Sequence, residues 1–170
     1  VLVFLCEGFE EIETVSPIDI LRRAGAQVTV ASLTKDLHVK GRSNIIMSAD
    51  VDLDAVKDQD FDCVLCPGGP GTKHLREDAR VISIVQRHHQ KSVKLAAICA
   101  APTVLHQAGV LGSKYTAHFS VKETIPDIME QAVVVDGNII TSRGAGTATE
   151  FGLAVVRELI SKEKSDEVAK

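Results

Sequence analysis

The stretch that decides the fold is residues 94–109, which read KLAAICAAPTVLHQAG. Its beginning, residues 93–98, is a short apolar run typical of a strand that is buried on both faces. The residues after Pro102 have helical character and end at Gly109, so Cys99 lies where a strand gives way to a helix. Small residues border this junction. The pattern predicts a nucleophile elbow, a sharp turn that lifts one reactive atom above the carboxyl edge of a sheet.

The sequence permits two interpretations of Cys99. A helix that begins just after the sulfur supplies partial positive charge, which favours the thiolate over the thiol. Cysteine is also among the residue types most often buried, so an inert packing role fits the same pattern.

Length and composition bound the class of protein. A chain of 170 residues has enough material for a sizeable core, and we expect residues 1–170 to form a single domain. Apolar residues make up 45% and charged residues 25%, ordinary values for a soluble globular protein. No apolar run approaches the roughly 20 residues that span a bilayer. A net charge of −4, no basic cluster and only 4% aromatic residues argue against a stable nucleic-acid or membrane partner.

Cysteine usage indicates the redox compartment. Three of the four cysteines, Cys6, Cys63 and Cys66, lie in or at the end of apolar strand-like runs, which is not the pattern of a secreted disulfide framework. We therefore expect a reducing, cytoplasmic location. The chain begins at Val1 inside a strand pattern, so it looks trimmed, which leaves open a targeting peptide upstream. Cys63 and Cys66 are expected to be core residues, because an odd separation along a strand points side chains to opposite faces.

Strand and helix patterns alternate along the chain. Buried strands are predicted over residues 1–6, 27–33, 61–66 and 93–98, with helices over residues 10–24, 79–89 and 148–161. Shorter strand-like pieces occur at residues 38–40, 45–47 and 114–116, and a hairpin at residues 136–138 joins residues 133–135 to 139–141. This alternation predicts an α/β fold, a mostly parallel sheet with helices on both faces. In such sheets the functional crevice lies beyond the carboxyl ends of the strands, where residues 6–8, residues 67–69 and Cys99 would meet.

Local signals refine three of these elements. Pro17 predicts either a kinked first helix or a helical turn feeding a second helix, with Ser16 as an N-cap. Residues 53–57 are a candidate short helix capped by Asp50 or Asp52. Residues 147–150, Thr-Ala-Thr-Glu, have the spacing of a capping box that opens the last clear helix, and the charged tail from Lys162 is expected to be partly solvated.

Glu13 is the candidate acid. Glu10 and Glu11 are interpreted as a solvated acidic first turn, which is favourable to the helix dipole. Ile12 and Val15 flank Glu13, so we expect its carboxyl to be turned inward and to stay protonated. It could then donate a hydrogen bond to the sulfur of the elbow, or shuttle a proton in catalysis.

Backbone donors and one imidazole complete the candidate site. Gly68 and Gly69 could present N–H groups that form an oxyanion hole with the N–H of Ala100, although residues 67–69 could also be an ordinary turn. His118 is the best candidate for an imidazole partner. The other histidines are expected to be solvated (His38, His74, His88 and His89) or to pack at the surface (His106). No histidine pair has strong zinc spacing and no phosphate loop occurs, so no metal site is predicted.

Together these pieces resemble the ThiJ/PfpI superfamily, in particular the branch of the Parkinson-disease-associated deglycase. The matching stretches are EEIETV (10–15), RRAG (22–25), PGG (67–69), AAICAAPT (96–103) and TSRGAGT (141–147). The resemblance implies a flavodoxin-like three-layer sandwich, a homodimer, and no metal or organic cofactor. It also implies that Cys99 is an oxidation-sensitive nucleophile and Glu13 its protonated partner, that Gly69 and Ala100 are the oxyanion donors, and that His118 lies nearby. Arg23, Arg42 and Arg143 would support the site from the dimer edge.

The activities that this resemblance implies are cofactor-free conversion of methylglyoxal to lactate, repair of glyoxal-derived adducts on proteins and nucleotides, redox sensing and chaperoning. The adduct repair is disputed, since free methylglyoxal in equilibrium with adducts can mimic it. Ala100 stands where the peptidase branch has histidine, which disfavours proteolysis. Ala145 replaces a usual proline. Met47 replaces a peripheral cysteine, and this replacement weighs against redox chemistry at the dimer edge. The chain also stops at Lys170, short of the family's usual end.

Two functions follow as hypotheses. In the first, the chain is an enzyme for small α-oxoaldehydes, in which Cys99 attacks the aldehyde and Glu13, with His118, moves the proton. In the second, it is a redox sensor or chaperone in which the same sulfur is oxidised to sulfinic acid without turnover.

Overall fold

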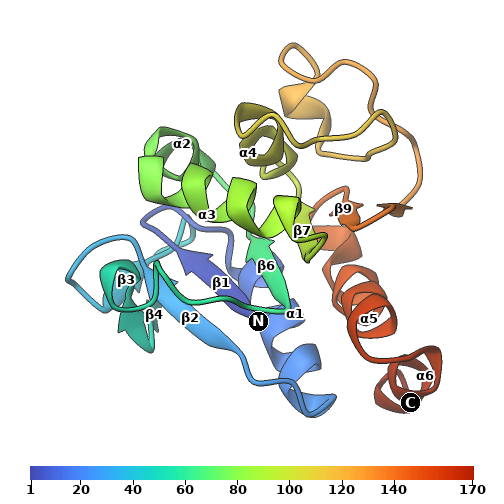
Figure 1. Ribbon diagram of the computed structural model, residues 1–170, viewed down its shortest axis with the longest axis horizontal. Helices are drawn as coiled ribbons and strands as arrows, with labels where there is room; N and C mark the ends of the chain where they lie inside the picture. Colours follow the sequence, from blue (N-terminus) through green and yellow to red (C-terminus); the bar gives the residue numbers. More distant parts are fainter.

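A seven-stranded sheet runs through the computed structural model, which describes residues 1–170 (Figure 1). Its strands are β1 (Leu2–Leu5), β2 (Thr29–Ser32), β5 (Val51–Asp52), β6 (Cys63–Cys66), β7 (Lys94–Ile98), β8 (Val133–Asp136) and β9 (Ile139–Ser142). They are ordered β5-β2-β1-β6-β7-β9-β8, and every neighbouring pair is parallel except β8 and β9. A separate antiparallel hairpin joins β3 (His38–Lys40) to β4 (Ile46–Ser48). The prediction of a mostly parallel sheet is confirmed.

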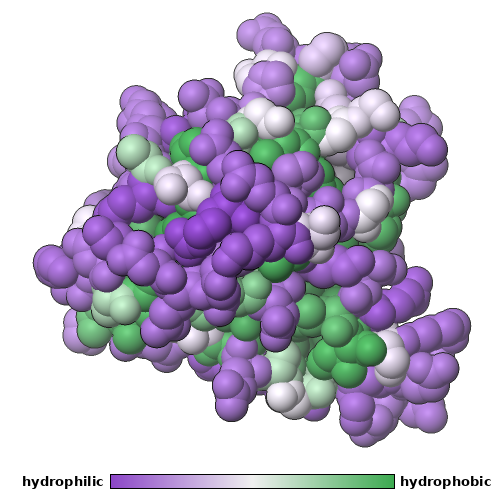
Figure 2. Space-filling model, in the orientation of Figure 1, coloured by the Kyte–Doolittle hydropathy of each residue, from purple (hydrophilic) through white to green (hydrophobic).

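Helices cover both faces of this sheet. On one face lie α1 (Glu11–Arg23) and α5 (Ala148–Leu159), with α6 (Lys162–Val168) packed on α5. On the other face lie α2 (Thr72–Glu77), α3 (Ala79–Gln90) and α4 (Pro102–Gln107). Three short 3₁₀ helices complete the chain: η1 (Leu53–Ala55), η2 (Phe119–Val121) and η3 (Ala145–Thr147). Hydrophilic residues gather over the outer side of α3 (Figure 2), and no helix is both long enough and apolar enough to cross a bilayer.

The alternation of side chains along the strands divides the interior into two cores. On β6, for example, Val64 and Cys66 belong to the core under α3 and α4, whereas Cys63 and Leu65 belong to the core under α1 and α5. Successive side chains on a strand point to opposite faces, so each fully buried strand serves both layers. The interpretation of Cys63 and Cys66 as core residues on opposite faces is confirmed.

The buried face of α1 differs from the sequence prediction. Ile12 is 53% and Val15 48% exposed, although both were expected to face the core. Glu11 is only 7% exposed, although it was expected to be solvated. Oε1 of Glu11 accepts hydrogen bonds from the backbone N–H of Ser43 at 2.8 Å and of Ile45 at 3.4 Å, which compensates part of the desolvation, whereas Oε2 is buried without a partner. The helix itself is continuous, with Pro17 inside it.

Several local predictions are wrong for identifiable reasons. Residues 114–116 form no strand, only an isolated bridge between Tyr115 and Ile128. The expected capping box at Thr147 is absent, because its hydroxyl donates to the carbonyl of Gly144 at 3.0 Å instead of capping α5. The charged tail from Lys162 is mostly exposed, as expected, and most of it is helical, as α6.

Two further residues predicted to cap or to be solvated have other roles. Asp50 does not cap the short helix η1, and its carboxylate instead accepts the N–H of Val30 at 2.8 Å, while Asp52 makes no side-chain cap. His88 is fully buried rather than solvated: its Nε2 accepts the N–H of Phe61 at 3.0 Å, and its Nδ1 lies 2.7 Å from the carbonyl of Ile84.

Candidate active site

Cys99 directly follows β7 and adopts a left-handed backbone conformation, with φ of 65°. A residue with a side chain in this region costs of order 1–3 kcal/mol, so surrounding contacts must hold it there. Its N–H donates to the carbonyl of Ser142 at 2.9 Å, and its carbonyl accepts the N–H of His118 at 2.8 Å. The turn is thus fixed from both sides, and α4 begins three residues later at Pro102.

The Glu13 side chain reaches Cys99 from the first turn of α1. Glu13 is 2% exposed, its Oε2 has no hydrogen-bond partner, and its carboxyl lies close enough to the Cys99 thiol that each group shifts the pKa of the other. Gly68 makes this approach feasible, because a Cβ at that position would overlap Glu13 Oε2 and lie 2.6 Å from Cys99 Cβ. Burial raises the pKa of Glu13 to about 7, against the opposing effects of the Cys99 thiol and of the charge of Arg42.

The electrostatics of the sulfur correct the expectation of a thiolate favoured by the turn alone. Burial, together with the negative charge of Glu13, raises the pKa of Cys99 to about 12, while the backbone N–H groups of Gly69 and Ala100 act in the opposite direction and lower it. Desolvation outweighs the partial charge of the six-residue helix α4. Between about pH 7 and pH 12 the Glu13–Cys99 pair therefore holds one proton, and the sulfur is ionised only when that proton is on the carboxyl.

A cavity of about 530 Å³ opens beside this pair. Its lining includes six of the residues named from the sequence, Glu13, Arg42, Gly69, Cys99, Ala100 and His118. Gly68 lies beneath it, between Glu13 and Cys99. Arg23 and Arg143 do not line it: Arg23 pairs with Asp19 at 2.8 Å, and Arg143 donates to the carbonyl of Glu130 at 3.0 Å.

His118 lines the cavity, and one of its two ring nitrogens is already hydrogen-bonded within the protein. Its Nδ1 accepts the N–H of Ser120 at 3.3 Å and lies 2.8 Å from the Ser120 hydroxyl, so Nε2 is the nitrogen available to a bound molecule. Its ring packs on Phe119 with 4.2 Å between centroids. A Cβ on Gly144 would lie 3.6 Å from His118 Cδ2 and 3.8 Å from Glu13 Oε1, so the imidazole and the carboxyl flank the same glycine.

Among the lining residues that the sequence did not predict for the site are Glu10, Thr72 and Arg76. Glu10 is the N-cap of α1, and its Oε2 accepts the N–H of Glu13 at 2.8 Å. An N-cap acid was detectable in principle, because a carboxylate before an apolar-periodic helix is a common start signal. Thr72 and Arg76 lie on α2, a six-residue helix too short to produce a periodic signal.

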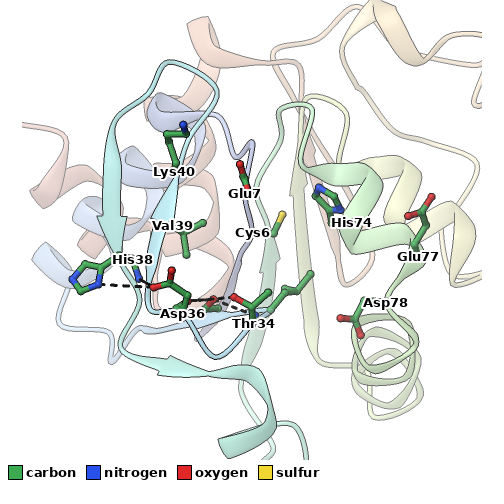
Figure 3. Close-up of a pocket in the computed structure, with 12 residues that line it drawn as sticks. Cys6, Glu7, Thr34, Asp36, His38, Val39, Lys40, His74, Glu77 and Asp78 are labelled. Atoms are coloured by element: carbon green, nitrogen blue, oxygen red, sulfur yellow. Dashed lines mark hydrogen bonds and ion pairs between the residues drawn. The ribbon is translucent and has the colours of Figure 1, made fainter.

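A second cavity, of about 480 Å³, lies between the β3 segment and α2 (Figure 3). Asp36 and His38 line one side and His74 and Glu77 the other, with Cys6 between them. Cys6 is 7% exposed, its thiol donates to the carbonyl of Gly71 at 3.1 Å, and burial raises its pKa to about 12. No group of three His, Cys, Asp or Glu side chains in the structure is placed to hold a metal ion.

These features coincide with a known family. The pattern of the DJ-1/PfpI family matches residues 1–158, and the chain belongs to this family. It is 42% identical to protein DJ-1beta of Drosophila melanogaster over 175 aligned positions, covering 99% of this chain and 94% of that protein. The crystal structure of Drosophila DJ-1beta superimposes with a TM-score of 0.95 at 41% identity, covering 99% of this chain and 94% of that one. The flavodoxin-like fold implied by the resemblance is thereby confirmed.

Two other relatives bear on function. The chain is 34% identical to the glutathione-independent glyoxalase DJR-1.2 of Caenorhabditis elegans, covering 96% of this chain and 90% of that protein. It is also 36% identical to Toxoplasma gondii DJ-1 in a structure described as oxidized, with a TM-score of 0.95, covering 99% of this chain and 94% of that one.

Proposed function

We propose that this chain is a cofactor-independent enzyme for small α-oxoaldehydes, methylglyoxal and glyoxal, or their adducts on proteins and nucleotides. The observation that carries the proposal is that Glu13 and Cys99 lie against the same glycine, Gly68, shift each other's pKa and line one cavity together with Gly69 and Ala100. The relative in C. elegans that is named a glutathione-independent glyoxalase supports it.

The reaction begins with the one-proton form of the pair, in which the carboxyl of Glu13 holds the proton and Cys99 is the thiolate. The sulfur adds to the aldehyde carbon of methylglyoxal, and the resulting oxyanion takes a proton to give a hemithioacetal. A base then removes the hydrogen from the former aldehyde carbon, and a proton is returned to the neighbouring carbonyl carbon. This transfer leaves a lactoyl thioester on the sulfur. Water hydrolyses the thioester to lactate and frees the thiolate, so one water is consumed per turnover.

Each residue of the cavity has a role in these steps. Glu13 moves the proton, since burial holds its pKa at about 7, close to the working pH of a general acid–base catalyst. The N–H groups of Gly69 and Ala100, which lower the pKa of the sulfur in the free protein, hold the oxyanion of the hemithioacetal. His118 assists through Nε2, because its Nδ1 is engaged by Ser120.

The test is the formation of lactate from methylglyoxal by the wild type, Cys99→Ser and Glu13→Gln. We expect both variants to lose at least about 100-fold in kcat, because each removes a group that acts in the transition state. Cys6→Ser is the matched control and should keep wild-type activity, since a hydroxyl can also donate to the carbonyl of Gly71. Turnover that persists in Cys99→Ser would refute the proposal.

A second candidate function is redox sensing, which the relative described as oxidized supports. Two molecules of peroxide would convert the Cys99 thiolate to a sulfinate and release two waters. The Glu13 carboxyl and the N–H groups of Gly69 and Ala100 would donate to the sulfinate oxygens. Mass spectrometry after mild peroxide discriminates the two functions: two oxygens added at Cys99 in a protein without turnover would favour the sensor. A chaperone role for the oxidised form is part of the same candidate.

We also propose a homodimer in the cytoplasm. Four of the seven exposed large apolar side chains lie on two segments, Ile12 and Val15 on α1 and Ile45 and Ile46 at β4, and hydrogen bonds to Glu11 connect these segments. All four cysteines are free, which fits a reducing compartment. Sedimentation should show a dimer that Ile46→Asp dissociates. The control Ile160→Asp, at an apolar residue beyond α5, should leave the dimer intact, and a wild-type monomer would contradict the proposal.

A further inference from the structure

Arg76 has an unusual set of partners for an arginine of this chain. It is half-buried on α2 beside the catalytic cavity, and it forms no ion pair, in contrast to Arg80 and Arg87. One nitrogen, Nη1, donates to two threonine hydroxyls, to Thr103 Oγ1 at 3.0 Å and to Thr72 Oγ1 at the longer distance of 3.4 Å. Thr72 is the first residue of α2 and Thr103 the second of α4, two helices that pack against each other.

The two hydroxyls continue into the site. Thr72 Oγ1 donates to the carbonyl of Gly69 at 3.0 Å, and Thr103 Oγ1 donates to the carbonyl of Ala100 at 2.6 Å. Gly69 and Ala100 are the two residues whose backbone N–H groups lower the pKa of the Cys99 thiol. Both halves of the candidate oxyanion hole, one from the loop after β6 and one from the turn after β7, are therefore connected through a single guanidinium.

The direction of these hydrogen bonds is fixed by chemistry. A guanidinium has only donors, so each threonine hydroxyl must accept a hydrogen bond from Arg76 and donate its own proton to the backbone carbonyl. The hydrogen-bond network runs from Arg76 through Thr103 to Ala100, and from Arg76 through Thr72 to Gly69. The charged guanidinium of Arg76 polarises both threonine hydroxyls and strengthens the hydrogen bonds through which they orient the two loops.

We propose that Arg76 is a positioning residue that sets the placement of the Gly69 and Ala100 N–H groups relative to the Cys99 sulfur. The expected effect of Arg76 on turnover rests on the proposed function, whereas its expected effect on the reactivity of the Cys99 sulfur does not. Donors that act on a developing charge must be placed to within a fraction of an ångström, and a shift of about 1 Å can cost about 100-fold in rate.

The experiment compares Arg76→Ala and Arg76→Lys with the wild type. The first readout is the rate constant for alkylation of Cys99 by iodoacetamide, assigned to Cys99 by peptide mass spectrometry. We expect Arg76→Ala to alkylate about tenfold more slowly, the equivalent of about one unit in the thiol pKa. Arg76→Lys should recover most of the loss, because a single nitrogen makes both contacts and an ammonium has three donors. In methylglyoxal turnover, kcat should fall about 10- to 100-fold in Arg76→Ala with KM nearly unchanged.

A double-mutant cycle with Thr103→Val separates positioning from a general structural role. Thr103→Val should slow alkylation by itself, and Arg76→Ala should then add little. Arg87→Ala is the matched control, since Arg87 donates to the carbonyls of Lys57 and Gln59 away from the site, and it should leave the alkylation rate unchanged.

Three outcomes would overturn the proposal: wild-type alkylation in Arg76→Ala, full additivity in the cycle, or a raised KM with unchanged alkylation, which would make Arg76 a substrate-binding residue. If the wild type does not turn over methylglyoxal, the proposed function fails, and the alkylation series still decides the role of Arg76. If Arg76→Ala does not fold, Thr103→Val and Arg76→Lys give the same comparison.

Discussion

Replacing Gly68 by alanine tests how tightly Glu13 and Cys99 are packed against each other. A Cβ at Gly68 would overlap Glu13 Oε2 and would lie 2.6 Å from Cys99 Cβ and 2.8 Å from the carbonyl oxygen of Ile98. Gly68 is not in the left-handed region of φ, so alanine is compatible with its backbone conformation and the effect comes from space alone.

The magnitude follows from what must move. The Ile98 carbonyl belongs to a fully buried strand, so the Glu13 carboxyl and the Cys99 turn have to yield. Overpacking of this kind costs about 1–3 kcal/mol of stability. Relief to ordinary van der Waals distance takes the carboxyl roughly 1 Å from its place, which corresponds to about a 100-fold loss in kcat/KM.

The assay is kcat/KM for methylglyoxal together with urea unfolding of Gly68→Ala. Gly146→Ala is the control, because it lies in the same site region, is outside the left-handed region and has no atom within 4 Å of its added Cβ. We expect wild-type kinetics from the control and the loss above from Gly68→Ala. Wild-type kinetics and stability in Gly68→Ala would refute the packing argument.

Two further predictions concern stability. Burial lowers the pKa of His88 below 6.5, so below that pH the unfolded chain binds a proton that the native imidazole, accepting from Phe61, does not. The free energy of unfolding should therefore fall as the pH drops below 6.5, by at most about 1.4 kcal/mol per pH unit, and His88→Gln should remove this dependence in urea titrations. Glu11→Ala should cost about 1.5–3 kcal/mol, because it leaves the N–H groups of Ser43 and Ile45 without their charged acceptor. An unfolding free energy equal to wild type would contradict this role of Glu11.

The layered fold could be predicted because it depends on local signals. Apolar runs such as residues 61–66 and residues 93–98 are buried strands whichever neighbours they find, and right-handed connections between them leave few topologies. The elbow at Cys99 was visible for the same reason, since a buried strand, small residues and a proline at a helix start are adjacent in sequence. Buried strands and the elbow were recoverable from contiguous residues, whereas the cap at Thr147 was not, because a neighbouring carbonyl takes the same hydroxyl proton.

The orientation of α1 was not recoverable, because it depends on distant groups. Glu13 was expected to turn inward, but Ile12 and Val15 have the spacing of a core stripe, and nothing local shows that they are exposed and that Glu11 is buried in their place. Glu11 is buried because N–H groups 32 and 34 positions further on satisfy it. Arg76 was missed on similar grounds, since its partners become neighbours only when the loops after β6 and β7 meet.

The raised pKa of Cys99 is a third case of this kind. The sequence showed a helix after the sulfur, which favours a thiolate, but not the burial and the neighbouring carboxyl that oppose it. These opposing effects are what make Glu13 and Cys99 a pair that titrates together rather than an isolated reactive thiol.

The most direct test of this shared proton is the rate of Cys99 alkylation as a function of pH in the wild type and in Glu13→Gln. The wild type should show a rise centred near pH 7, where the pair loses its first proton, followed by a plateau. Glu13→Gln should lack this rise and gain reactivity only at higher pH, as a single thiol does. Identical profiles for the two proteins would contradict the central claim.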